Sequence, residues 1–191
     1  MPASTRRRAP AKPDGADALT AATSQALSDF EYGLIVGGAA FHYWVDRCMA
    51  ASGMPGISAQ DALILHAVNH RARNRKLADI CLVMHIEDPH VVSYALKKLI
   101  AYGLAGCEKV GRERRYAATA KGDALCERYR AVRDHVLVRN LAWLGDQQAL
   151  IGSAASFLRT MTALYDQAAR NATVEGAAMP PLPTGGKAPA A

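Results

Sequence analysis

The chain has 191 residues, of which half are hydrophobic and only 6% are aromatic. Its core must therefore be built mainly from Ala, Leu, Val and Ile, and the abundance of Ala and Leu favours a mostly helical fold. No apolar run reaches the roughly 18 residues of a membrane-spanning helix, and no apolar segment follows the arginines at positions 6–8. We therefore expect neither a membrane protein nor a secretory signal.

The positive charge of the chain lies in one stretch. The formal net charge is +6, and residues 71–133 alone hold fourteen Lys or Arg against seven Asp or Glu. The rest of the chain is close to neutral. A basic segment inside a near-neutral chain is typical of a protein that binds a nucleic acid.

Both ends of the chain lack hydrophobic periodicity. Residues 1–23 and 172–191 are rich in Ala, Pro and Thr or Gly, and we expect them to be disordered tails. The folded part then covers residues 24–171. Its first helix is predicted over 25–51, where apolar side chains return at three- and four-residue steps.

The middle of the chain predicts three shorter helices, over residues 58–69, 77–84 and 89–102. Ser58 followed by Asp61 three residues later resembles a capping box, which begins the first of them. Asp88 is a suitable N-cap for the third helix, because a proline follows it at the first helical position.

A hairpin with a basic tip is predicted after the third of these helices. Gly103 followed by Leu104 indicates a helix end of the Schellman type. Residues 105–110 and 115–118 are then expected to be extended. Thr119 is placed to cap a further helix that continues toward position 143, and a last helix is expected up to position 169.

This order of elements predicts a mostly α fold with a winged helix-turn-helix, whose wing is a two-stranded β-hairpin. Residues 58–118 would form the winged-helix DNA-binding lobe. The helices over 25–51 and 120–169 have apolar faces that a chain of this size would struggle to cover alone, so we interpret them as dimerisation helices. Packing against the same helices of a second copy would form a two-fold symmetric homodimer.

Over about residues 28–168 the sequence resembles the MarR family of multiple antibiotic resistance regulators. The most specific stretch runs from the third short helix through the wing. Leu99, Gly103 and Leu104 fit the end of the family's recognition helix. After a basic wing, Thr119 begins a Thr-x-x-Gly helix start that is also typical of the family.

The resemblance implies an obligate homodimer that binds a palindromic operator in double-stranded DNA, often released by a small-molecule effector or by oxidation. The chain would then be a sequence-specific regulator of transcription. One departure lies in the wing, where residues 111–115 read Gly-Arg-Glu-Arg-Arg in place of the family's Asp-x-Arg element. Because this Asp is missing, the resemblance gives weaker support for the salt bridge that family members form within the wing, although the arginines remain.

The candidate DNA-binding residues lie on the outer face of the recognition helix, on the wing and ahead of the second short helix. Base contacts specify a sequence, whereas phosphate contacts position the protein. The candidates are His90, Ser93 and Tyr94 for bases or nearby groups, and Lys97, Lys98, Arg112, Arg114, Arg115, Arg73 and Arg75 for phosphates or the minor groove. The alternative for each is an ordinary solvated surface.

Two groups in the predicted helices have both a functional and a structural interpretation. His42, Trp44 and Arg47 are candidates for binding an effector, and ordinary dimer packing is the alternative. His66 and His70 have the i, i+4 spacing of two metal ligands, but the HExxH motif is absent. We favour a packed histidine at position 66 and expect no metal and no cofactor.

The four cysteines form no CxxC pair, which favours reduced thiols, a cytoplasmic location and no zinc site. Cys107 and Cys126 have polar neighbours and are candidates for a redox sensor. Cys48 and Cys81 are interpreted as core residues.

The chain contains no GxSxG, P-loop or dinucleotide motif, so we do not expect an enzyme. Two alternatives to a ligand-released regulator stay open. One is a winged-helix module that binds a protein instead of DNA, and the other is a thiol-based redox-sensing regulator.

Overall fold

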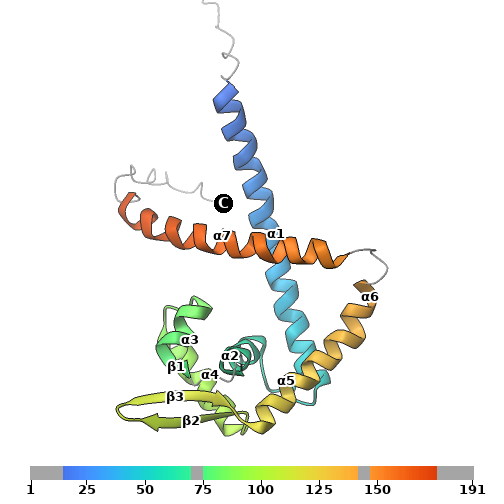
Figure 1. Cartoon of the computed structure of the whole chain (residues 1–191), viewed down its shortest axis with the longest axis vertical. Coiled ribbons are helices and arrows are strands. Elements are labelled where there is room, and N and C mark those ends of the chain that lie inside the picture. The colour runs from blue at the N-terminus through green and yellow to red at the C-terminus, as the bar shows by residue number, and fades with distance from the viewer. Residues whose placement is uncertain (1–14, 70–74, 142–146, 176–191) are drawn as a thin grey trace, which may run out of the picture. The chain divides into compact units, whose positions relative to one another are not determined.

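The computed structural model of the chain describes residues 15–69, 75–141 and 147–175. The chain divides between Val136 and Leu137 into two compact units. The fold is mostly α with one small sheet, as predicted (Figure 1). Among the described residues, no helix combines the length and hydrophobicity needed to cross a membrane.

The long helices at the two ends of the chain exceed their predicted bounds. Helix α1 spans Gly15–Ala51, so the prediction of a disordered tail is wrong for residues 15–23. This segment contains four Ala and one Leu among its nine residues, and such strong helix formers extend a helix without the apolar periodicity that marks its predicted start. In the second unit, helix α7 spans Gln147–Glu175 and passes the predicted end at residue 169.

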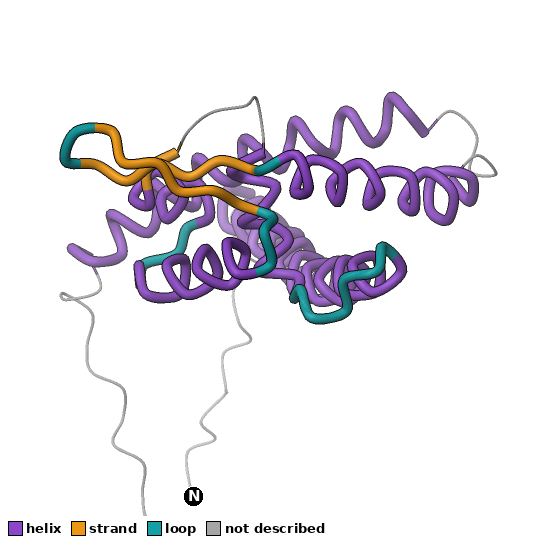
Figure 2. The backbone as a smooth tube through the Cα atoms, turned by 90° about the horizontal axis from the view of Figure 1, so that it is seen from below, coloured by secondary structure: helices purple, strands orange, loops and turns teal. Residues whose placement is uncertain are grey.

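The first unit contains a winged helix-turn-helix with three helices and a three-stranded antiparallel sheet. The elements are α2 (Ala59–Asn69), β1 (Arg75–Lys76), α3 (Leu77–Met84), α4 (Pro89–Ala101), β2 (Ala105–Val110) and β3 (Glu113–Ala118). The strand order is β1-β3-β2. Figure 2 shows the sheet in orange, with the turn of the β2–β3 hairpin at its tip.

Strand β1 was not predicted. Its two residues pair with β3, with Arg75 opposite Tyr116 and Lys76 opposite Arg115. Two basic residues in a polar stretch carry no alternating pattern, so local sequence gives no sign of a strand. The pairing with β3 determines this strand, which is a tertiary effect.

The hydrophobic core of the first unit joins α2, α4 and the C-terminal part of α1. Val92, Leu96 and Leu99 return at three- and four-residue steps along α4, and all three side chains are almost fully buried. Ile64 and Leu65 of α2 are equally buried. Each such side chain contributes about 1.5–3 kcal/mol when it leaves water, so apolar packing holds the inner face of α4 on the core.

After the wing, helix α5 spans Ala120–Arg133, a π-helical turn covers Asp134–Val138, and the short helix α6 covers Arg139–Leu141. The described residues are thus helical from 120 to 141, as predicted, but no feature of the sequence indicated the π turn within this helix. A π turn inserts an extra residue, and such insertions have no reliable local signal. The predicted break at Gly145 and Asp146 lies outside the described residues.

Backbone contacts join the end of α4 to the start of α5. Gly103 has a positive φ of 71°, and the amide of Leu104 donates to the carbonyl of Leu99 over 2.8 Å. This confirms the predicted Schellman end. The Thr119 hydroxyl donates to the Gly103 carbonyl over 2.7 Å and accepts from the Gly122 amide over 3.2 Å. Thr119 therefore caps α5 and also fixes the turn that follows α4.

Gly122 is packed too closely for any side chain. A carbon added there would lie 2.0 Å from the carbonyl oxygen of Leu104. We expect Gly122→Ala to lower the free energy of unfolding by about 2 kcal/mol, the cost of overpacking, in a urea titration followed by circular dichroism. Gly106→Ala is the control, because its added carbon would meet only Thr119 Cγ2 at 3.9 Å. Equal free energies of unfolding for the two variants would contradict the close packing of Gly122 against the Leu104 carbonyl.

Candidate nucleic-acid interface

Helix α4 begins with the cap that the sequence predicts. The Asp88 carboxylate accepts a hydrogen bond from the amide of His90 over 2.9 Å, and Pro89 occupies the first helical position. The cap fixes the first turn, which carries His90. The N-terminal end of the helix also has the polarity that suits a phosphate group.

The outer face of α4 is open to solvent. His90, Tyr94 and Lys97 are exposed, Tyr94 to 73%, and Ser93 is half-buried. These four residues therefore lie on the outer face, as predicted. Polar side chains on a helix that is open along this face match the shape and the hydrogen-bonding groups of a major groove.

The tip of the wing carries a cluster of cations. Gly111, with a φ of 63°, and Arg112 form the turn, and both Arg112 and Arg114 are exposed. Lys109 lies directly opposite Arg114 in the hairpin register and is exposed as well. Sequence reasoning missed Lys109, although a two-residue turn at positions 111 and 112 fixes this pairing and could have revealed it.

Glu113 supplies the wing with internal ion pairs. Lys76 Nζ of β1 lies 2.6 Å from one carboxylate oxygen of Glu113, and a guanidinium nitrogen of Arg115 lies 3.6 Å from the other. The hydrogen bond from Lys76, with the nearby positive charges, lowers the pKa of Glu113 below its usual value. The chain thus has an acidic partner in the wing although the family's Asp is missing, and Arg115 is half-buried beside it.

One of the two remaining predicted cations lies beside the wing. Arg75 is half-buried on β1, next to β3. Arg73 lies outside the described residues, so its predicted phosphate contact stays a prediction.

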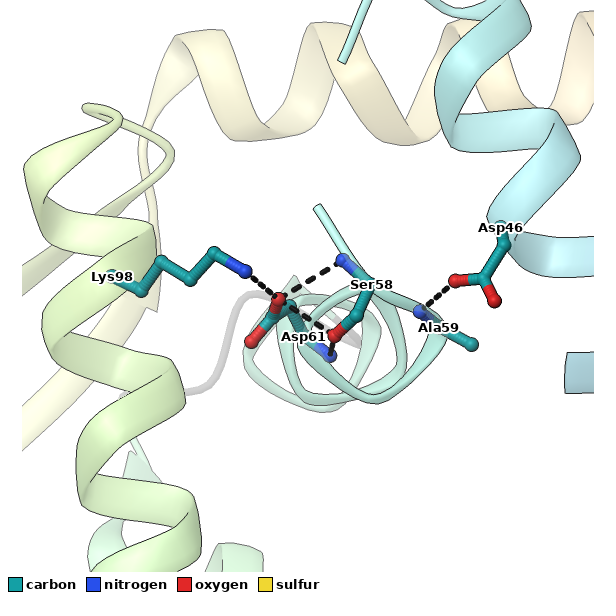
Figure 3. Close-up of polar contacts among 5 residues, drawn as sticks. All are labelled: Asp46, Ser58, Ala59, Asp61 and Lys98. Atoms are coloured by element: carbon teal, nitrogen blue, oxygen red, sulfur yellow. Dashed lines mark hydrogen bonds and ion pairs between the residues drawn. The ribbon is translucent and has the colours of Figure 1, made fainter. Parts of the chain in front are cut away.

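The start of helix α2 is held by two carboxylates (Figure 3). The amide of Ser58 donates to Asp61 Oδ2 over 3.0 Å, and the amide of Asp61 donates to Ser58 Oγ over 3.2 Å. These two bonds confirm the predicted capping box. From α1, Asp46 Oδ1 accepts a hydrogen bond from the amide of Ala59 over 2.5 Å.

Lys98 has a different partner from the one predicted. Its ammonium lies 2.6 Å from Asp61 Oδ2, with side-chain exposures of 28% for Lys98 and 7% for Asp61. Burial alone would raise the pKa of Asp61, but hydrogen bonds from Lys98 and Ser58 outweigh it and leave the pKa below 3.8. The same hydrogen bond raises the pKa of Lys98. Lys98 therefore bonds to the core of the lobe, whereas we expected it at a phosphate.

The three candidate effector residues are not brought together within one chain. Trp44 packs against the core, whereas Arg47 is exposed and lies over the ring of Tyr43 at 4.9 Å. His42 lines a separate hollow between α1, α2 and the end of α3, together with Asp46. Positions 42 and 44 face different sides of a helix, because successive residues turn by about 100°.

Cys48 and Cys126 belong to the buried core, and His66 packs against a core residue. Cys126 is buried, and burial raises the pKa of its thiol to about 11, so the prediction of Cys126 as a sensor candidate is wrong. Cys107 is exposed. The His66 ring packs edge-on against Tyr129, 5.1 Å between centroids, and the described residues contain no cluster of three potential metal ligands. His70 lies outside them.

Residues 57–122 match the sequence family described as the winged helix DNA-binding domain. No protein of curated function is significantly similar to the chain in sequence. A MarR-family transcriptional regulator from Rhodococcus sp. RHA1 has a similar structure, with a TM-score of 0.60 and 18% identity over 70% of this chain and 93% of that one.

Two further solved structures have the same fold. CouR from Rhodococcus jostii RHA1, crystallised with p-coumaroyl-CoA, gives a TM-score of 0.59 and 20% identity over 72% of this chain and 94% of CouR. The transcriptional regulator SlyA gives 0.59 and 17% identity over 73% of this chain and 95% of SlyA. The lobe is thus a winged-helix domain, and the chain has the fold of MarR-family regulators, as the sequence resemblance implied.

The half-buried imidazole of His66 should make stability depend on pH. Burial lowers its pKa below 6.5, and the charges of Arg130 and Arg133 lower it further. The unfolded chain then binds a proton more readily, so the free energy of unfolding falls as the pH drops below about 6.5 and through the folded-state pKa. We expect urea titrations from about pH 7 to pH 5 to show a smaller fall for His66→Phe than for the wild type.

The control is Tyr129→Phe, which keeps the imidazole and the ring packing and should retain the wild-type fall. If His66→Phe showed an unchanged pH profile, the imidazole would not have a lowered pKa in the folded protein.

Proposed function

We propose that this protein is a homodimeric, sequence-specific DNA-binding regulator of transcription and not an enzyme. The observation that carries the proposal is the exposed polar face of α4 beside an exposed basic wing tip, within a lobe that matches winged helix DNA-binding domains. Both surfaces belong to the same compact unit. In the proposed complex, α4 enters the major groove and the wing binds the backbone or the adjacent minor groove.

The proposed roles follow the chemistry of each side chain. His90 and Ser93 are placed to bind base edges, and Tyr94 a thymine methyl group or a phosphate. Lys97 binds phosphate. At the wing, Arg112 and Arg114 are the main cations, with Lys109 added to them from the facing strand.

The proposal of a homodimer is supported by apolar side chains that one chain leaves in water. On α1, Tyr32 and Ile35 are 69% and 70% exposed; on α7, Leu150 and Leu164 are 62% and 57% exposed. Repeated exposure of large apolar groups along long helices is typical of association surfaces. A two-fold dimer would also present two α4 helices, which matches a palindromic operator.

A small-molecule effector is a further part of the proposal. CouR, which shares the fold, was crystallised with p-coumaroyl-CoA. The separation of His42, Trp44 and Arg47 within one chain removes the single cluster that we expected, so these residues define no effector class.

The wing arginines should contribute affinity without specificity. We expect Arg112→Ala combined with Arg114→Ala to weaken binding to AT-rich random duplex. The slope of log affinity against log salt should fall by about 0.9 for each phosphate that the variant no longer neutralises. Fluorescence anisotropy between 50 and 200 mM salt, concentrations over which such slopes are about linear, measures both quantities.

The matched control for the wing is Arg159→Ala with Arg170→Ala, which removes two exposed cations of α7 from outside the lobe. Equally weakened binding in the two double variants would argue against a wing contact. A wild-type protein that binds no duplex at low salt would favour the alternative, a lobe that binds another protein.

The α4 candidates should set the sequence preference. Genomic fragments bound by the wild type, recovered and sequenced, should share a palindromic site. We expect His90→Ala and Ser93→Ala to change the preferred bases within each half-site, since one good base contact discriminates by about 1–3 kcal/mol. The wing double variant should keep the wild-type preference. Unchanged preferences in both α4 variants would remove them as base readers.

A further inference from the structure

Two adjacent lysines on helix α4 have different environments. Lys97 is exposed on the outer face. Lys98 is half-buried, and its ammonium lies 2.6 Å from the buried carboxylate of Asp61 on α2. Lys97 therefore presents its positive charge to solvent, whereas Lys98 presents its charge to the interior of the lobe.

The carboxylate that binds Lys98 is itself fixed. Asp61 Oδ2 accepts from the Ser58 amide over 3.0 Å and from the Ser58 hydroxyl over 2.7 Å. The next amide along the chain, that of Ala59, donates to Asp46 of α1. Asp61 is thus a rigid acceptor that ties α4 to the start of α2, and a neighbouring bond ties this start to α1 (Figure 3).

The ion pair lies directly beside the proposed base readers. His90, Tyr94 and Lys98 line one cleft between the start of α2 and α4, together with Ser58 and Asp61. Apolar packing under α4 sets its distance from the core but is not directional. A short bond between charged groups is directional, so it restricts rotation of α4 about its own axis.

We propose that Lys98 is a positioning residue for DNA reading: through Asp61 it fixes the rotation of α4, so that the outer face meets the base edges, and it binds no phosphate itself. The inference rests on the proposed function and extends it. Base contacts demand placement within a hydrogen bond's narrow range of length and angle. Contacts to the uniform phosphate backbone carry no sequence information, so breaking the pair should lower discrimination more than general affinity.

The test compares Lys98→Met, Asp61→Asn, their double variant and Lys97→Met. Each is titrated by fluorescence anisotropy against the operator recovered with the wild type and against a scrambled duplex, over a range of salt. We expect Lys97→Met to weaken binding to both duplexes and to lower the salt slope by about 0.9 per phosphate. Lys98→Met should leave the slope unchanged and weaken operator binding about tenfold, which is the effect of one mismatched base pair.

Asp61→Asn should weaken operator binding as Lys98→Met does, although the loss of a negative charge would by itself favour binding to DNA. The double variant should be no weaker than either single one, because both changes break the same bond. Lys98→Arg, which can still donate to Asp61, should keep most of the operator preference. If Lys98→Met fails to fold by circular dichroism, Lys98→Gln takes its place with the same expected slope.

Three results would overturn the proposal. A salt slope that falls in Lys98→Met as it does in Lys97→Met would make Lys98 a phosphate ligand. Operator affinity unchanged in both Lys98→Met and Asp61→Asn would leave the pair without a role in reading, as would additive effects in the double variant. Failure of the wild type to bind any duplex is a different outcome, because it removes the proposed function itself.

Discussion

Helix α4 is held from one side by two kinds of interaction. Val92, Leu96 and Leu99 are buried against the core, and Lys98 bonds to the buried Asp61 at the edge of that contact. The burial leaves the opposite face with its polar side chains in solvent. The interface that we propose for DNA is therefore a consequence of how the inner face of α4 is packed.

Much of the lobe could be predicted because each boundary has its own local chemistry. Asp88 caps α4, Gly103 ends it with a positive φ, and Thr119 caps α5. Such signals act over three or four residues and can be read without knowing the fold. They placed helix α4 and the hairpin correctly, although the helices at the chain ends run longer than periodicity indicated.

The features that escaped prediction depend on residues far apart in the chain. The pairs Lys76–Glu113 and Lys98–Asp61 each join positions 37 apart, and strand β1 exists only through its pairing with β3. From the sequence alone, each of these lysines is interpreted in the same way, as a cation that is available to a polyanion. Only the tertiary structure distinguishes a cation that faces solvent from one already bonded to a carboxylate.

The short strand β1 has a consequence for the energetics of the wing. A two-stranded hairpin by itself is marginally stable in water, but here β1 pairs with the middle of β3, and Lys76 of β1 bonds to Glu113 next to the turn. An arm that is already ordered loses less conformational entropy when it meets a partner. The support from β1 would thus let the tip cations engage at a smaller entropic cost than cations on a mobile loop.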